Sequence, residues 1–221
     1  MRQISESEID SIRVPWMWDL GNSVLYDLCR QHPGHSRADE IVAKVWLIGR
    51  SYSASIERRR NAKVTGDRFY EKTVAQAIRN SPVDEWLETI GPTERPGGSA
   101  SIAVHKKLLD LFRSITDLEK RSLASKYLHF HRPDAFFIYD SRARRSITEV
   151  VPRLNRIPTI EADAFDVEYR DFVRRCAWLC SHVRITHKMD LTPRDLDKLL
   201  LMIAERRDLK KAAFLPTADY P

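Results

Sequence analysis

Glycine is scarce in this chain, and the phosphate-binding loops that depend on it are missing. The 221 residues include seven glycines, and neither G-x-x-x-x-G-K-[ST] nor G-x-G-x-x-G occurs. Those are the loops whose backbone N–H groups cradle nucleotide phosphates. The sequence therefore argues against a P-loop NTPase and against a nicotinamide-dependent enzyme.

Cysteine and long apolar runs are scarce as well. The three cysteines, Cys29, Cys176 and Cys180, are too few for a disulfide framework or for a four-cysteine iron–sulfur cluster. No apolar run approaches the ~20 residues of a membrane span, and the first ten residues lack the apolar core of a signal peptide. We therefore expect a cytoplasmic monomer with no membrane partner.

The composition is that of a folded protein with excess positive charge. Hydrophobic residues make up 43% and charged residues 31% of the chain, which carries a net charge of +6. Such a balance favours a packed core over disorder, and a basic surface favours an anionic partner.

Apolar residues recur at helical spacing along most of the chain. Ile41, Val45 and Ile48 begin one apolar face of a long helix expected from Arg37 to Arg60. No strand-like alternation is long enough to indicate a sheet, so we expect an all-α fold. Further helices are predicted around residues 20–28, 69–78, 102–115 and 196–203, with a capping box at Ser5 and Glu8 and an N-cap at Thr192.

Two segments rich in proline or glycine interrupt the helices. The stretch Gly91–Ser99 holds three of the seven glycines, and residues 151–164 contain two prolines. Neither is long enough for an independent linker. We expect a single all-α domain over residues 1–221, with two lobes at about 1–92 and 99–221.

The segment from Ser122 to Ser146 holds the strongest chemical candidate, Asp140. This carboxylate follows the run FFIY and precedes a helix with arginines. It can cap that helix, and a capping carboxylate can also face a substrate. A fixed carboxylate stabilises the positive charge that develops on a sugar when an N-glycosidic bond breaks, or activates the attacking water. Arg142, Arg144 and Arg145 would hold the flanking phosphates.

This segment resembles the aspartate segment of helix-hairpin-helix DNA glycosylases, which reads apolar-Val-Asp-Thr-His-Val-x-Arg. The matching residues run from Phe136 to Arg145. The resemblance implies a two-lobed helical bundle with double-stranded DNA and an extruded base between the lobes, and it places Asp140 at the catalytic aspartate. The family's glycine-rich hairpin has no counterpart in residues 121–126, which read RSLASK.

The resemblance implies a DNA N-glycosylase that excises a damaged or modified base by base flipping, without a cofactor. Modified bases of phage DNA are one class of substrate that it suggests. We expect a monofunctional enzyme in which Asp140 acts at the sugar. Lys126 would take the place of the Schiff-base lysine of bifunctional members, or is an ordinary helix lysine. The alternative is a non-catalytic helical nucleic-acid-binding protein, and a metal nuclease is a third option.

Several other side chains are candidates for contacts with the substrate or with phosphate. His129, His131 and Tyr139 flank the aspartate in the sequence, whereas Trp46, Tyr52 and Glu57 could line a base pocket or simply fill the core. Arg58 and Arg59 suit phosphate contacts. Metal binding is not expected, although two sets come near a ligand pattern: His129 with His131, and Cys176, Cys180, His182 and His187.

Overall fold

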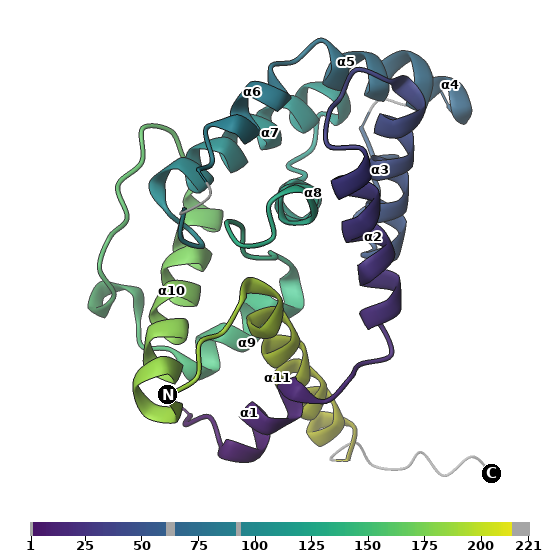
Figure 1. Ribbon diagram of the computed structural model, residues 1–221. Coiled ribbons are helices and arrows are strands. Elements are labelled where there is room, and N and C mark those ends of the chain that lie inside the picture. The colour runs from purple at the N-terminus through teal and green to yellow at the C-terminus, as the bar shows by residue number, and fades with distance from the viewer. Residues whose placement is uncertain (1, 61–64, 92–93, 214–221) are drawn as a thin grey trace, which may run out of the picture.

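The computed structural model describes residues 2–60, 65–91 and 94–213, and these residues form helices and no strand. Figure 1 shows α8 end-on near the middle of the molecule, with α2 to α7 above and to its right and with α1, α9, α10 and α11 below and to its left. The all-α prediction is confirmed. Within the described residues, no helix is both long enough and apolar enough to cross a membrane.

The helices follow one another with short connections. They are α1 (Glu6–Arg13), α2 (Asp19–Gln31), α3 (Ala38–Ser51), α4 (Asp67–Phe69), the π-helix η1 (Tyr70–Ala75), α5 (Gln76–Arg79), α6 (Val83–Glu88), α7 (Ser99–Thr116), α8 (Arg121–His131), α9 (Ser141–Val150), the 3-10 helix η2 (Leu154–Arg156), α10 (Val167–His187) and α11 (Pro193–Ala213).

Two hydrophobic cores lie on either side of the segment that joins α8 to α9. The first core gathers apolar residues from Leu25 to Phe136, and the second combines α1 with residues from Phe137 to Ile203. Residues on both sides of the Gly91–Ser99 loop belong to the first core. The division of the chain into lobes at that loop stays a prediction.

The sequence signals at two helix starts are confirmed. Ser5 caps α1, and the Glu8 carboxylate accepts a hydrogen bond from the Ser5 backbone N–H at 3.0 Å. At the start of α11, the Thr192 hydroxyl accepts a hydrogen bond from the Asp195 N–H at 3.1 Å. Both pairs satisfy backbone donors that a helix start leaves without intrahelical partners.

The helix predicted from Arg37 to Arg60 is too long, because α3 ends at Ser51. Ser53 takes a left-handed conformation with φ of 52°, and the Ala54 N–H then donates to the Gly49 carbonyl at 2.8 Å. The chain folds back over Gly49 so closely that a Cβ there would lie 3.4 Å from the Ser55 Cα. Glycine suits this close approach because it places no side chain against the returning backbone.

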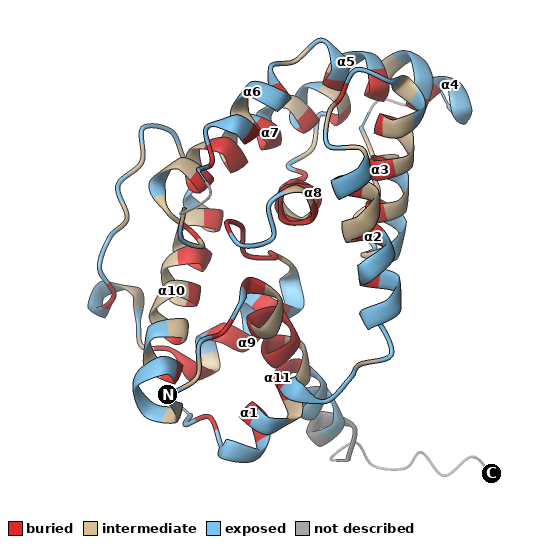
Figure 2. Cartoon of the chain, in the orientation of Figure 1, coloured by how far each residue is buried: buried red, intermediate tan, exposed pale blue. Residues whose placement is uncertain are grey.

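α8 is buried over most of its surface, as the red helix at the centre of Figure 2 shows. It packs against α2, α3 and α7. A helix in this position is normally apolar all round, yet α8 carries a lysine and a histidine that are both buried, Lys126 and His129. Their polar groups therefore need partners inside the protein.

Four buried histidines predict that the protein loses stability in mild acid. Burial lowers the pKa of His105 to about 3 and of His129 to about 4, and it also lowers the pKa values of His35 and His131. The unfolded chain, with histidine pKa values of about 6.5, therefore binds more protons. Stability is fully present above pH ~6.5 and falls toward pH 4, by ~1.4 kcal/mol per histidine and pH unit at most.

Urea unfolding at pH 7.5, 6.0 and 5.0 measures this effect. The raised pKa of Asp197 acts in the opposite direction, but it is one group against four. A free energy of unfolding that stayed constant between pH 7.5 and 5.0 would contradict the prediction.

Candidate functional site

Asp140 lies at the N-terminus of α9 and is held in place by the helix it caps. One carboxylate oxygen accepts a hydrogen bond from the Ala143 N–H at 2.8 Å, which confirms the capping role predicted from the sequence. The side chain keeps 22% of its surface exposed. Asp140 therefore offers a fixed carboxylate that is still open to solvent.

Lys126 of α8 faces the other oxygen of Asp140. The Lys126 Nζ lies 3.9 Å from the Asp140 Oδ2 and donates a hydrogen bond to the Ser122 Oγ at 2.8 Å. Its side chain is only 2% exposed, and burial lowers its pKa although Asp140 and Asp197 both act to raise it. A lysine in such surroundings holds its proton less tightly than a surface lysine does.

Hydrogen bonds between Ser125 and Tyr139 bring the two charged groups together. The Ser125 Oγ accepts from the Tyr139 N–H at 3.0 Å and lies 3.3 Å from the Tyr139 carbonyl oxygen, to which it also donates. Lys126 follows Ser125 and Asp140 follows Tyr139 in the sequence. The extended segment before α9 is thereby fixed against α8, which sets the distance between amine and carboxylate.

Tyr52 extends the site from α8 to the end of α3, at the first hydrophobic core. The Lys126 Nζ lies 5.3 Å from the centre of the Tyr52 ring, within range of a cation–π contact. The Tyr52 hydroxyl donates to the Asn22 Oδ1 at 2.6 Å and accepts from an Arg194 Nη1 at 3.3 Å. Of the base-pocket candidates predicted on the long helix, Tyr52 is the one that these contacts connect to Lys126.

α11 contributes a second carboxylate through Asp197. Its Oδ2 accepts a hydrogen bond from the Arg194 Nη1 at 2.6 Å, and the side chain is 1% exposed. Burial raises the pKa of Asp197 to about 7, and the charge of Asp140 acts to raise it as well, whereas Arg194 and Lys126 lower it. We refer to Lys126, Asp140, Tyr52, Arg194 and Asp197 as the inter-core cluster.

A cleft of about 920 Å³ opens beside this cluster and is lined by residues of α2, α6, the end of α8 and the start of α11. Arg194 belongs both to the cluster and to the wall of the cleft. His129 and Tyr26 also line it. The cluster thus has a neighbouring space large enough for a small molecule or for part of a larger one.

The two histidines of α8 are placed differently from each other. The His129 Nδ1 donates to the Phe136 carbonyl at 2.9 Å, so its Nε2 accepts from the Tyr26 hydroxyl at 2.6 Å. The His131 ring lies 4.9 Å from the ring of His35, and its Nε2 has no hydrogen-bond partner among the described residues. Both line the cleft. Their role as substrate contacts stays a prediction.

The other predicted substrate contacts have partners of their own or lie on the surface. The Tyr139 hydroxyl donates to Glu168, and Glu57 binds Arg50 at 2.5 Å. Trp46 is 43% exposed on α3. Within the described part of the chain, the contacts of Glu57 and Trp46 do not connect them to Lys126, and their role in a base pocket stays a prediction.

The predicted phosphate contacts fall into two groups. Arg142, Arg144 and Arg145 are exposed on α9, directly after Asp140. Arg58 is exposed beyond the end of α3, and Arg59 lies over the Phe69 ring at 3.7 Å while donating to the Glu57 carbonyl. The arginines of α9 therefore share a helix with the aspartate, whereas the other two belong to the segment that follows α3.

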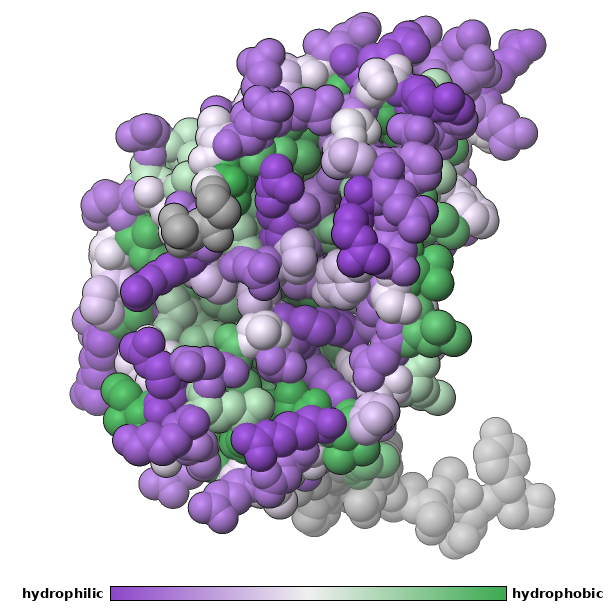
Figure 3. Space-filling view, in the orientation of Figure 1, coloured by the Kyte–Doolittle hydropathy of each residue, from purple (hydrophilic) through white to green (hydrophobic). Residues whose placement is uncertain are grey.

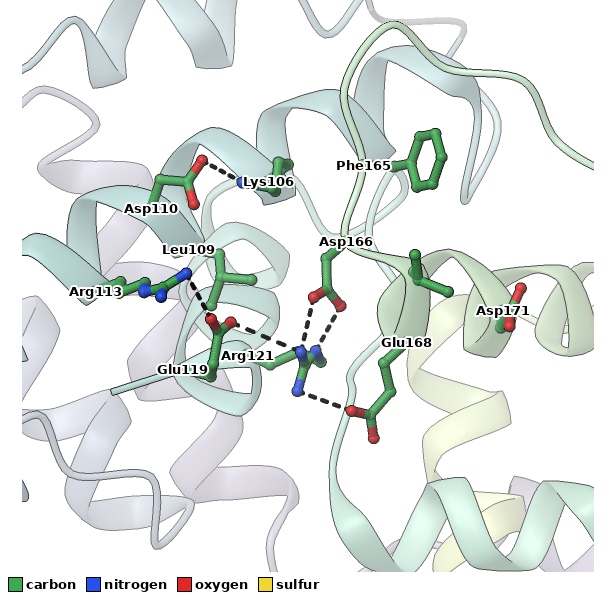
Figure 4. A pocket seen from close by; sticks show the side chains of 11 residues that line it. Lys106, Leu109, Asp110, Arg113, Glu119, Arg121, Phe165, Asp166, Glu168 and Asp171 are labelled. Atoms are coloured by element: carbon green, nitrogen blue, oxygen red, sulfur yellow. Dashed lines mark hydrogen bonds and ion pairs between the residues drawn. The ribbon is translucent and has the colours of Figure 1, made fainter. Parts of the chain in front are cut away.

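A second cavity lies near Arg121 but has the wrong charge for a polyanion. Figure 4 shows the Arg121 guanidinium bound by Asp166 at 2.5 and 2.7 Å, and by Glu168 at 3.0 Å. Five carboxylates and three cationic side chains line this cavity. Its residues act as a structural lock between α8 and α10, because Asp166 also caps α10.

Metal-binding alternatives gain no support from the geometry. No group of three or more histidine, cysteine, aspartate or glutamate side chains placed to hold an ion occurs in the described part of the chain. Cys176 is buried, and His182 stacks on Trp178 with ring centres 4.8 Å apart. Cys176, Cys180 and Trp178 pack within or against the second hydrophobic core.

Three residues of the site were missed by sequence reasoning: Asn22, Arg194 and Asp197. A usable signal was present for two of them. Asn22 stands one turn before Leu25 on the buried face of α2, and Asp197 interrupts the apolar run of α11 between Leu196 and Leu199. A polar side chain on a buried helix face needs a partner or has a function.

Apolar side chains also gather on the surface beside α2, where Figure 3 shows green at the right edge. Met17 and Leu20 are 81% and 78% exposed, and Trp18 and Val24 are exposed as well. This apolar patch lies open to solvent in the described part of the chain.

No protein-family model matches the chain, and neither a curated protein nor a solved structure gives a significant match.

Proposed function

We propose that the protein is a DNA N-glycosylase that flips a damaged or modified base out of double-stranded DNA and hydrolyses its N-glycosidic bond. The observation that carries this proposal is the pairing of the partly exposed Asp140 carboxylate with the buried Lys126 amine, at 3.9 Å, between the two hydrophobic cores.

Asp140 suits the sugar because it is a fixed charge next to a space for substrate. Its hydrogen bond to Ala143 occupies one oxygen and restricts rotation, which leaves the second oxygen to face developing positive charge. Charge placed in advance in a site that is partly shielded from water stabilises an oxocarbenium-like state more than a mobile side chain does. Cleavage of the N-glycosidic bond needs such stabilisation at C1′.

The arginines of α9 suit the phosphates on either side of that sugar. Arg142 and Arg145 are exposed and lie three residues apart on the helix that Asp140 caps. Cationic side chains on such a helix would bind the DNA backbone without reading its sequence. The distance from the phosphates to the sugar is then set by the helix itself.

Lys126 has two alternative parts in this chemistry, and we propose the non-covalent one. As an ammonium bonded to Ser122, it orients Asp140 and balances its charge. As a neutral amine it could attack C1′ and form a Schiff base, which its lowered pKa would favour. The hydroxyl of Ser122 and the carboxylate of Asp140 both stabilise the protonated form, and this supports hydrolysis by water.

The test is an assay of the purified protein on a panel of DNAs, including genomic DNA, DNA with damaged bases and modified phage DNA. We expect abasic sites, revealed by strand breakage after alkali, and free base without breakage before alkali. Borohydride should trap no covalent complex. A trapped complex lost in Lys126→Met would assign the reaction to the amine instead.

DNA binding without base release from any member of the panel would favour the non-catalytic alternative. The exposed arginines of α9 are compatible with that alternative. In that case, reversing the charge of Arg142 and Arg145 should remove binding and reduce its salt dependence, whereas the Asp140→Asn protein should function normally. Strand cleavage that chelator abolishes would point to the metal nuclease.

A further inference from the structure

Asp197 is a buried carboxylate with one oxygen left over. Its Oδ2 is bonded to Arg194 at 2.6 Å, but its Oδ1 has no hydrogen-bond partner among the residues that the structure describes. A buried polar atom without a partner carries a desolvation cost that a paired one avoids. A protein keeps such a group at that cost when its chemistry needs a free acceptor.

Hydrogen bonds and a ring contact link Asp197 to Lys126. Asp197 binds Arg194, the same Arg194 nitrogen donates to the Tyr52 hydroxyl at 3.3 Å, and the Tyr52 ring lies 5.3 Å from the Lys126 Nζ. Lys126 in turn faces Asp140. The two carboxylates of the inter-core cluster therefore stand near one cation, one of them open to solvent and the other enclosed.

Their surroundings divide the two carboxylates into different roles. Asp140 is 22% exposed, caps a helix and is fixed by a backbone N–H, all of which suit a permanent negative charge. Asp197 is enclosed, and burial brings its pKa to about 7, so it can take up and release a proton near neutral pH. Two carboxylates that titrate at different pH values are the usual arrangement for acid–base work in one site.

The charged and titratable groups around Asp197 come from every helix packed near it. They are Arg194 on its own helix, Lys126 of α8, Asp140 at the start of α9, Tyr26 of α2, Tyr52 after α3 and Cys176 of α10. The pKa values of the phenols and of the thiol are raised by burial, so these groups stay neutral at physiological pH. Arg194, Lys126 and Asp140 are the charged neighbours.

We propose that Asp197 is the general base of the reaction, and that its Oδ1 takes the proton from the water that attacks C1′ while Asp140 faces the sugar. This rests on the proposed function. The N-glycosidic bond breaks with its electron pair leaving on the base, and the water oxygen forms the new bond to C1′. The water proton passes to Asp197, and the departing base takes up a proton from solvent.

The decisive variant is Asp197→Asn, which keeps the size of the side chain and an acceptor for Arg194 but cannot accept a proton. Single-turnover base release should fall ~10²–10⁴-fold, the usual contribution of a general base. In the wild-type enzyme the rate should rise with pH and level off above pH ~7, and this rise should disappear in the variant. DNA affinity should be unchanged because the side chain is enclosed.

Asp190→Asn is the matched control, since it removes the same charge from an exposed position just before α11. It should leave both the rate and its pH profile as in the wild type. Arg194→Gln gives a second reading that does not depend on the folding of the Asp197→Asn protein. Removal of this cation should raise the pKa of Asp197, so the rise in rate should move to higher pH.

Full activity of Asp197→Asn with an unchanged pH profile would overturn the proposal and leave the glycosylase function intact. An Arg194→Gln protein whose pH profile did not move would also count against it. Failure of the wild-type protein to release any base would instead overturn the proposed function and this inference together.

Discussion

Replacing Asp140 with Asn is expected to reduce base release at least ~10²–10³-fold, the usual loss when one preorganised electrostatic contact is removed. DNA affinity should change by less than about twofold, because phosphate contacts from other side chains supply most of it. The amide can still accept the hydrogen bond from the Ala143 N–H, so α9 keeps its cap. What is lost is the negative charge that would stabilise the sugar. Abasic sites measured under single-turnover conditions, alongside a binding titration, separate the two effects.

Asp163→Asn is a suitable control for this experiment, because Asp163 is exposed in the loop before α10. It should keep full activity. If Asp140→Asn weakened DNA binding as much as it slowed base release, Asp140 would be a binding residue rather than a catalytic one. If the variant kept full activity, Asp140 would be a helix cap only.

Replacing Arg121 with Met is expected to lower the free energy of unfolding by ~3–5 kcal/mol, the range for breaking a buried ion pair. The guanidinium holds Asp166 through two hydrogen bonds, at 2.5 and 2.7 Å, and the two side chains are 17% and 12% exposed. Methionine would leave the Asp166 carboxylate without its main partner. Denaturation by urea, followed by circular dichroism, measures the loss.

Arg113→Met provides the comparison on the same network. Arg113 is 63% exposed and pairs with the half-exposed Glu119, so its loss should cost less than ~1 kcal/mol. Similar losses in the two variants would show that Arg121 is no more important than a surface arginine. The Arg121 contacts would then not be the lock between α8 and α10.

Local signals in the sequence are sufficient for the helices and for the capping role of Asp140. The capping patterns at Ser5 and Thr192 depend on residues three apart, and both are present in the structure. The immediate neighbours of Asp140 predict a helix cap, which is what the structure shows. Interactions within one helical turn can be predicted from sequence because the backbone geometry fixes their distances.

The remainder of the site depends on packing between distant segments. Arg194 reaches Tyr52 across 142 positions of the chain, and no pattern within either helix indicates this contact. The partner of Glu57 is likewise set by tertiary structure. α3 ends at Ser51 and the chain turns back through the left-handed Ser53, which brings Glu57 to Arg50, although the apolar spacing continues past this turn.

The two hydrophobic cores share elements, which bears on how the protein unfolds. α7 contributes Ile102 to the second core and Leu108 to the first, and the segment before α9 likewise places Phe136 in one and Phe137 in the other. Neither core can lose its packing without removing residues that support its neighbour. Denaturation should consequently be a single cooperative transition, so that a fragment carrying one core alone would lack the contacts it needs to fold.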